Sequence, residues 1–289
     1  MSVAQQPTDI PKGYQFTRAA AATVLTIPSR TGHRRILHDY WVKDGASGFS
    51  DLKVGNATLL RVYDNLAIAA LIQGAAQRFG NMGFLGYLAA KMKDMPLFNA
   101  GQDESIVFTR DSAADLLLAR WEDQDSGDIT NRALPGGSQA KKHLFILNRS
   151  NLAALTASGV FTFDFEDMPA GLSMFTDGSR MSANNRFTLY GVACNNPVTG
   201  ASEVTAVHIF DEQVELFTSE TNTGLNTIAA QETQLGFDIS PPGMFWLDEP
   251  YVFQPNRQLA FKGDFTKVAA DDLAAKTQKL FLIGIREML

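Results

Sequence analysis

The amino-acid sequence predicts a mainly β protein made of two sandwiches or barrels in tandem. Short runs of β-branched and aromatic residues recur along the chain, and Gly, Pro and Asn separate them at spacings of roughly 8–15 residues. A pattern in the first half of the chain returns roughly 160 residues later. A chain of 289 residues is long enough for two such domains.

The predicted strands follow one another in a regular series. In the first half they cover Thr23–Ile27, Ile36–Val42, Leu52–Val54 and Ala57–Val62. The last two form a hairpin, because Gly55-Asn56 supplies the positive φ that a two-residue turn needs. In the second half they cover Phe187–Cys194, Val204–Phe210, Val214–Phe217, Leu235–Ile239, Met244–Leu247, Gln258–Phe261 and Lys279–Ile285.

One further strand is predicted where Phe161, Phe163 and Phe165 alternate with polar residues. Side chains at every second position of a strand lie on the same face. The pattern therefore predicts that the three rings lie together on one face of a single strand.

Three segments differ from the strand pattern. Residues 1–18 are polar and contain two prolines, which predicts an extended N-terminal arm that becomes ordered against a partner. Residues 64–93 carry apolar residues at helical spacing after Asp64, a suitable N-cap, which predicts a helical insertion. Because Gly80, Gly83 and Gly86 interrupt it, we expect two helical pieces joined near residues 81–83. A second short helix is predicted at 269–276.

The internal repeat joins an edge-like strand, a polar loop, a strand that ends near an Asp, a link and a closing apolar strand. The first copy contains Leu97–Asn99, Ile106–Phe108, Asp111 and Leu116–Glu122. The second copy contains Val252–Gln254, Leu259–Phe261, Asp264 and Phe281–Glu287. If the repeat reflects a duplication, two β-barrels of similar topology lie in tandem.

The hairpin region carries a likeness to a known family. Residues 52–63 read LKVGNATLLRVY and lead into a segment with Leu66 and Leu71. This arrangement resembles the double jelly-roll major capsid proteins of tailless icosahedral bacteriophages with an internal membrane, of the corticovirus and tectivirus types. The closing strand Phe281–Glu287 also resembles the last strand of such barrels.

The resemblance implies a fold, a function and partners. The fold would be two tandem jelly-roll β-barrels, at 19–150 and 151–289, with short helical insertions. The function would be that of a virion structural protein, a major capsid protein that forms trimeric, pseudo-hexameric capsomers of an icosahedral shell. The partners would be copies of the same chain, minor capsid proteins and an internal membrane surface, with assembly in the host cytoplasm.

Composition and motifs favour a structural protein over an enzyme. The net charge of −6 gives no sign of a surface for nucleic acid, which needs concentrated Lys and Arg. The lone cysteine, Cys194, allows neither an internal disulfide nor a cysteine-based zinc site. The chain contains no nucleophile elbow, phosphate loop, dinucleotide fingerprint or HExxH zinc motif. We therefore expect no catalytic activity and no cofactor.

Two clusters remain as candidate sites. The acidic loop 122–128 offers Asp123, Asp125 and Asp128 as cation ligands, although it lacks the residue order of a calcium loop. Arg34 and Arg35 are the only adjacent arginines, and they are candidates for contact with a neighbouring subunit or with lipid head groups.

Two other functions fit a chain of strands. The first is a binding module, either a receptor-binding or tail-associated phage protein or a carbohydrate-binding β-sandwich, which exposed Trp and Tyr on one sheet face would support. The second is a β-fold hydrolase, which needs convergent carboxylates. The adjacent pairs Glu166-Asp167 and Asp248-Glu249 do not converge, because neighbouring residues of a strand point to opposite faces.

Overall fold

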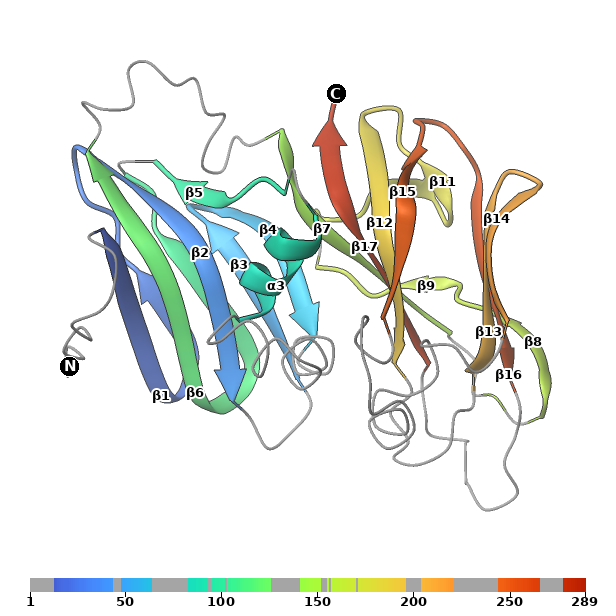
Figure 1. The fold of residues 1–289 in the computed structure, drawn as a ribbon, viewed down its shortest axis with the longest axis horizontal. Coiled ribbons are helices and arrows are strands. Elements are labelled where there is room, and N and C mark those ends of the chain that lie inside the picture. The colour runs from blue at the N-terminus through green and yellow to red at the C-terminus, as the bar shows by residue number, and fades with distance from the viewer. Residues whose placement is uncertain are drawn as a thin grey trace. The chain divides into compact units, whose positions relative to one another are not determined.

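The structure is a computed structural model that divides the chain into two compact units, Met1–Phe145 and Ile146–Leu289. The residues it describes are 13–43, 48–63, 83–92, 95–101, 103–125, 141–151, 155, 157–169, 171–195, 204–220, 244–265 and 278–289. Antiparallel strands dominate this part of the chain (Figure 1). The predicted mainly β fold class is therefore confirmed.

The first unit contains six strands and one helix within the described ranges. They are β1 (Tyr14–Ile27), β2 (His33–Lys43), β3 (Phe49–Val54), β4 (Ala57–Tyr63), α3 (Phe84–Lys91), β5 (Phe98–Ala100) and β6 (Ile106–Asp125). The predicted hairpin is present as β3 and β4, and Gly55 in its turn has a φ of 56°. Glycine adopts this left-handed conformation without the steric cost that a Cβ imposes.

The long strand β6 organises the first unit. β1 pairs along one side of it, while β3 and β2 share its other side. β3 pairs with residues 106–110 and β2 with residues 116–125. β1 and β6 thereby belong to two branches, with orders β1-β6-β2-β5 and β1-β6-β3-β4. A register shift between Ala22 and Val24, which bends and twists a strand pair, lies where the branches diverge.

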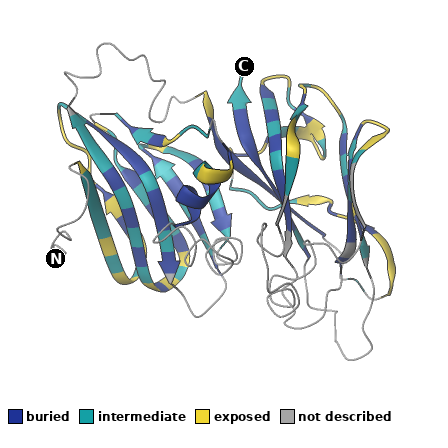
Figure 2. Cartoon of the chain, in the orientation of Figure 1, coloured by how far each residue is buried: buried dark blue, intermediate teal, exposed yellow. Residues whose placement is uncertain are grey.

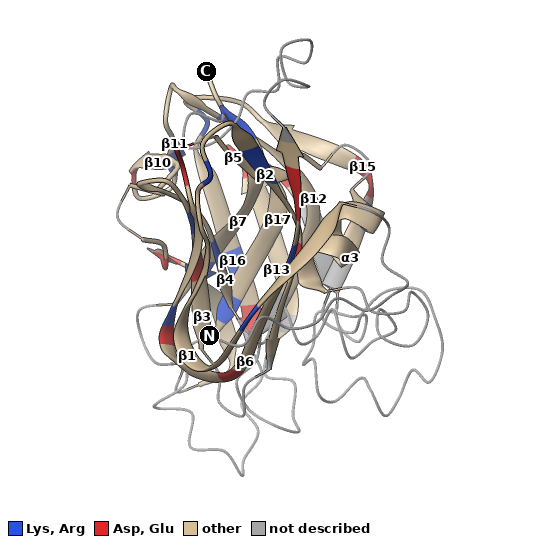
Figure 3. Cartoon of the chain, turned by 90° about the vertical axis from the view of Figure 1, so that its left-hand side faces the viewer, with Lys and Arg blue, Asp and Glu red and all other residues tan. Residues whose placement is uncertain are grey.

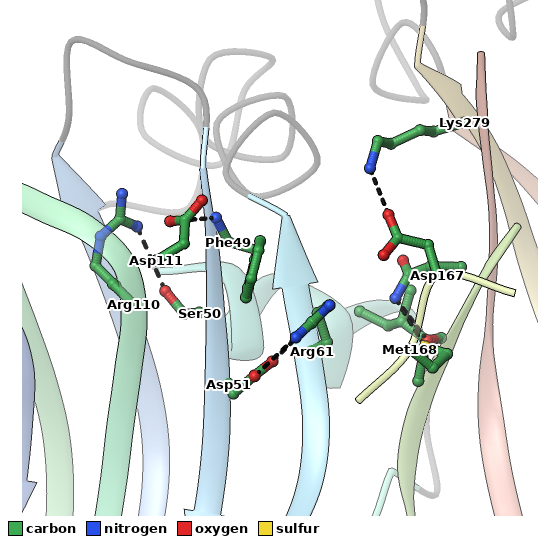
Figure 4. A network of polar contacts seen from close by, with 11 residues as sticks. Phe49, Ser50, Asp51, Arg61, Arg110, Asp111, Asp167, Met168 and Lys279 are labelled. Carbon is green, nitrogen blue, oxygen red and sulfur yellow. Dashed lines mark hydrogen bonds and ion pairs between the residues drawn. The ribbon is translucent and has the colours of Figure 1, made fainter. Parts of the chain in front are cut away.

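Side chains of both branches meet in the core of the first unit. The rings of Tyr40 on β2 and Phe108 on β6 stack with centroids 3.8 Å apart. The Tyr40 hydroxyl lies 2.8 Å from Oγ of Ser50 on β3. Arg110 Nη1 donates to the same Oγ at 3.4 Å (Figure 4). The polar ends of Tyr40 and Arg110 are thus satisfied inside an otherwise apolar core.

The second unit contains two larger sheets. One has the order β15-β12-β17-β7-β9 and the other β14-β13-β16-β8. β7 (Lys142–Ser150) begins just before the division between the units and belongs to a sheet of the second. The other strands are β8 (Gly159–Thr162), β9 (Phe165–Glu166), β12 (Asn185–Asn195), β13 (Val204–Asp211), β14 (Val214–Glu220), β15 (Met244–Phe253), β16 (Leu259–Phe265) and β17 (Lys279–Met288). β10 (Phe175–Asp177) and β11 (Arg180–Met181) pair separately. The fold is β-rich and jelly-roll-like.

Close packing in the second unit depends on a glycine in β17. The rings of Phe187 and Phe253 stack at 6.3 Å on neighbouring strands, and both side chains are buried. Figure 2 shows most of β17 in the colour of buried residues. A Cβ on Gly284 would lie 2.1 Å from the carbonyl oxygen of Thr188 and 2.6 Å from the ring of Phe187. Only glycine allows β17 to approach β12 this closely.

The structure corrects two predictions. Residues 14–18, assigned to the arm 1–18, belong to β1, where they pair with β6 and Thr17 accepts a hydrogen bond from Trp121 Nε1 at 2.9 Å. Phe161, Phe163 and Phe165 do not share a strand, because the chain leaves β8 after Thr162 and re-forms as β9 at Phe165. Phe163 is buried, whereas Phe165 is 44% exposed.

The helical insertion is described in part. α3 begins at Phe84, directly after the interruption predicted at 81–83, and its buried side chains include Phe84 and Leu88. Residues 1–12, the first piece of the insertion, the strand at 235–239 and the helix at 269–276 lie outside the described residues. No helix in the described ranges is long and apolar enough to cross a membrane.

Candidate functional site

One face of the β1-β6-β2 sheet carries half-buried aromatic rings. Tyr14 lies edge-on to His38 with ring centroids 4.8 Å apart, and the Arg120 guanidinium lies 5.4 Å from the Tyr14 ring. Next to them, Phe16 and Trp41 are 6.5 Å apart. Rings and an arginine side by side offer both apolar and cation–π contacts to a ligand or a protein. The sequence did not group them, because they come from three strands.

Helix α3 is fastened to β2 beside this face by a buried carboxylate. Asp39 is 0% exposed, and it accepts hydrogen bonds from the backbone N–H groups of Gly83 at 2.6 Å and Gly86 at 3.0 Å. The amide of Tyr40 donates to it at 2.9 Å, and Arg120 lies 3.8 Å away. The carboxylate thereby satisfies backbone donors that a helix start leaves free.

The surroundings of Asp39 act on its pKa in opposite directions. Burial raises the pKa, whereas the hydrogen bonds from Gly86, Gly83 and Tyr40 and the charge of Arg120 lower it, and burial has the larger effect. A Cβ would lie 2.4 Å from Asp39 at position 83 and 2.6 Å at position 86. Gly83 and Gly86 are about one helical turn apart, and this spacing lets both glycines pack closely against the carboxylate.

A basic cluster surrounds Asp123, one of the predicted cation ligands. Its carboxylate lies 2.8 Å from Arg30 Nη1, 3.3 Å from Arg35 Nε and 3.3 Å from His33 Nδ1. Arg34, on the opposite side of β2, donates to Asn99 Oδ1 at 2.7 Å and 3.2 Å. The structure brings Arg35 and Asp123 together, and the described ion-pair partners of Asp123 are basic side chains.

The two predicted arginines are largely withdrawn from solvent. Arg34 is 6% and Arg35 is 4% exposed, and burial lowers the pKa of each guanidinium. The side chain of Asp125 and the whole of Asp128 lie outside the described residues. Among the residues that are described, no group of three or more His, Cys, Asp or Glu could hold a metal ion.

A second polar cluster lies on the sheet β14-β13-β16. His208 Nδ1 is 2.6 Å from Glu215 Oε1, and its Nε2 is 3.4 Å from Asp264 Oδ2. Burial lowers the pKa of His208, but the two carboxylates together outweigh burial and raise it above its ordinary value. Because the carboxylates occupy both ring nitrogens, the imidazole serves here as an ion-pair partner.

Arg149 is an important residue that sequence reasoning missed. Its side chain is buried, and it donates to the carbonyl oxygens of Phe163 at 3.2 Å, Asp164 at 3.3 Å and Gly178 at 3.2 Å. The rings of Phe175 and Phe261 lie 5.3 Å and 5.4 Å from the guanidinium. Arg149 therefore holds together the segments that contain these three carbonyls. No spacing rule predicts it, because its acceptors are backbone atoms.

The acidic pairs that a hydrolase would need do not form a convergent site in the described structure. Asp167 is bound by Lys279 Nζ at 2.6 Å (Figure 4). Asp248 and Glu249 are both exposed on the edge strand β15. An acid–base pair requires two carboxyl groups that face one reacting atom.

Comparison with known proteins gives distant similarities to solved structures. No protein-family model matches the chain, and no curated protein sequence matches it. Among solved structures, the major capsid protein P2 from bacteriophage PM2 is similar at 12% identity and a TM-score of 0.45, over 96% of this chain and 98% of that one. The tandem CBM51 modules of a family 98 glycoside hydrolase from Streptococcus pneumoniae match at 7% identity and a TM-score of 0.20, over 93% of this chain and 84% of that one. The VP2 subviral particle of infectious bursal disease virus matches at 8% identity and a TM-score of 0.21, over 99% and 79%.

Proposed function

We propose that this chain is a tandem double jelly roll that acts as a viral major capsid protein, forming homotrimers that tile an icosahedral shell. Localisation would be the virion, after assembly in the host cytoplasm. The observation that carries the proposal is the strand order, which is the same in the two units.

The second unit has the order expected of a jelly roll. An eight-stranded antiparallel ribbon that rolls up pairs its first strand with its last, its second with its seventh, and so on inward. The sheets β7-β17-β12-β15 and β8-β16-β13-β14 have this order, with β9, β10 and β11 as additions.

The first unit repeats that order with fewer separate strands. β1-β6-β2-β5 corresponds to β7-β17-β12-β15, and β1-β6-β3-β4 corresponds to β8-β16-β13-β14. β7 and β8 of the second unit thus correspond to the single bent strand β1, and β16 and β17 correspond to β6. This correspondence supports two jelly rolls in one chain.

The internal repeat in the sequence falls on equivalent strands. Its first copy covers β5 and both halves of β6, and its second copy covers β15, β16 and β17. Sequence and strand order therefore give the same alignment of the two units, which supports a duplicated domain.

The composition supports a role in assembly. Charged residues make up 19% of the chain against about 25% in average soluble domains, and 20 of its residues are Phe. Large permanent interfaces are apolar, like a domain core cut in two. We propose copies of the chain as the main partners and minor capsid proteins and a membrane surface as further ones, with no catalytic role.

The proposal is tested by the mass and shape of the purified full chain. Native mass spectrometry at micromolar concentration should give three times the chain mass, and electron microscopy should show blocks of pseudo-hexagonal outline. A chain that remains monomeric at these concentrations would contradict the capsid function.

The aromatic face of β1, β2 and β6 favours one alternative, a carbohydrate-binding module, because jelly rolls also serve as lectin domains. Rings of Tyr14, Phe16 and Trp41 could stack on a sugar. A glycan array with the wild-type chain and Trp41→Ala tests it. Glycan binding that disappears in the variant would support this alternative, and the absence of binding would exclude it.

A further inference from the structure

β1 is an edge strand in the described part of the chain. β1 pairs with β6 along one side, and among the described residues no strand pairs with the other side of Gln15–Ile27. A strand edge is a row of N–H and C=O groups whose spacing fits another extended strand. The chemistry of this edge therefore selects a β-strand as its occupant.

Three other edges of this chain carry features that discourage pairing. The edge strand β15 contains Asp248, Glu249 and Pro250, all of them exposed. β5 and β8 are only 3 and 4 residues long. Charges, prolines and short length are the usual means by which proteins protect sheet edges from association.

β1 is 14 residues long and lacks these protections; the positive φ of Ala21 and the register shift between Ala22 and Val24 mark the end of its regular N-terminal stretch. Arg18 is its one charged residue, and it contains no proline. Figure 3 shows its ribbon almost entirely in the neutral colour. Ala20 and Ala21 are exposed, as is Val24 at 44%. Small side chains allow a second backbone to approach the edge closely.

We propose that the β1 edge from Gln15 to Ala21 pairs antiparallel with the same edge of a second copy, across a two-fold axis. This rests on the proposed self-assembly and names one of its contacts. Every copy presents the same edge, and two identical edges satisfy each other when they run antiparallel. Because a two-fold contact closes after two copies, it joins one trimer to the next and does not build the trimer.

Added charge on the edge tests the pairing. Ala20→Lys/Ala21→Lys places two further positive charges beside Arg18 on both members of the pair, so repulsion should weaken trimer–trimer association about tenfold or more while trimers persist. The matched control is Ala183→Lys/Gln213→Lys, which adds the same charge at exposed turn positions of the second unit. Mixing the Lys variant with Ala20→Glu/Ala21→Glu should restore association.

Sedimentation and amide hydrogen exchange of the full-length protein provide the readouts. In the wild type, exchange at residues 15–21 should slow as trimers associate. The inference is overturned if the Lys variant associates as strongly as its control, if trimers associate without slower exchange there, or if the Lys variant loses the trimer itself.

The two proposals fail in different ways. A wild-type chain that forms only dimers with slow exchange at residues 15–21 would refute the capsid function and support the edge pairing. Trimers that associate through another surface would leave the capsid function standing and refute the pairing. A chain that never associates would refute both.

Discussion

Replacing Asp39 with alanine should release helix α3 from β2. The carboxylate accepts the backbone N–H groups of Gly83 and Gly86, and the substitution leaves both donors without a protein partner. An orphaned buried donor costs about 1–3 kcal/mol, so two cost about 2–6 kcal/mol.

Burial offsets part of this loss. Because burial raises the pKa of Asp39, holding the carboxylate charged costs free energy in the folded state, which the variant avoids. Water also reaches a helix start once the side chain is truncated. We therefore expect a net loss of about 2 kcal/mol, which for a unit of this size lowers the melting temperature by about 4–8 °C.

Calorimetry and hydrogen exchange measure this effect together. The transition of the first unit should move down, and exchange at the amides of residues 83–91 should accelerate. Asp177→Ala, at the exposed end of strand β10 in the second unit, is the control and should stay within about 0.5 kcal/mol of wild type. Unchanged stability and unchanged exchange in Asp39→Ala would refute the role of this carboxylate.

Three further predictions concern the second unit. Gly284→Ala should cost about 3 kcal/mol or more, because its Cβ would meet backbone at Thr188, and a denaturant midpoint equal to wild type would contradict this. Arg149→Met should lower the free energy of unfolding by about 2–4 kcal/mol, because it leaves three carbonyls unsatisfied, and chemical unfolding measures this loss. A loss below about 0.5 kcal/mol, the size of a surface effect, would count against it. Because the pKa of His208 is raised in the folded state, its protonated imidazole stabilises the fold fully below a pH of about 6.5. This contribution is lost as the pH rises through the pKa of the folded state. His208→Gln should therefore lose more stability at pH 6 than at pH 9, and equal losses would show that the ion pairs contribute nothing.

The strand pattern was the part of the fold most open to prediction. Alternation and turn residues located the β3–β4 hairpin, because local backbone preferences at Gly55 and the flanking apolar residues act together. The N-terminal boundary failed, since Tyr14–Arg18 are polar in pattern but pair with β6, which lies far away in sequence. Deleting residues 1–18 should therefore lower stability as well as affect assembly.

The candidate site was less accessible from sequence. Arg34, Arg35 and Asp123 were identified as chemistry-bearing residues, but the pairing of Arg35 with Asp123 depends on the register of β2 against β6. Asp39 gave no signal at all, because its partners are backbone amides of a helix that follows more than forty residues later. A contact between a side chain and distant backbone amides produces no periodic pattern in the sequence.

The bent β1–β6 pair has a mechanical consequence for the first unit. Each of these strands runs from one branch of the sheet into the other, so the same two chain segments connect both branches. The branches therefore cannot slide past one another without breaking ladder hydrogen bonds. In the second unit, separate strands form the two sheets. Under load, the first unit should therefore yield as a single block, and stiffness would be concentrated in that half of the chain.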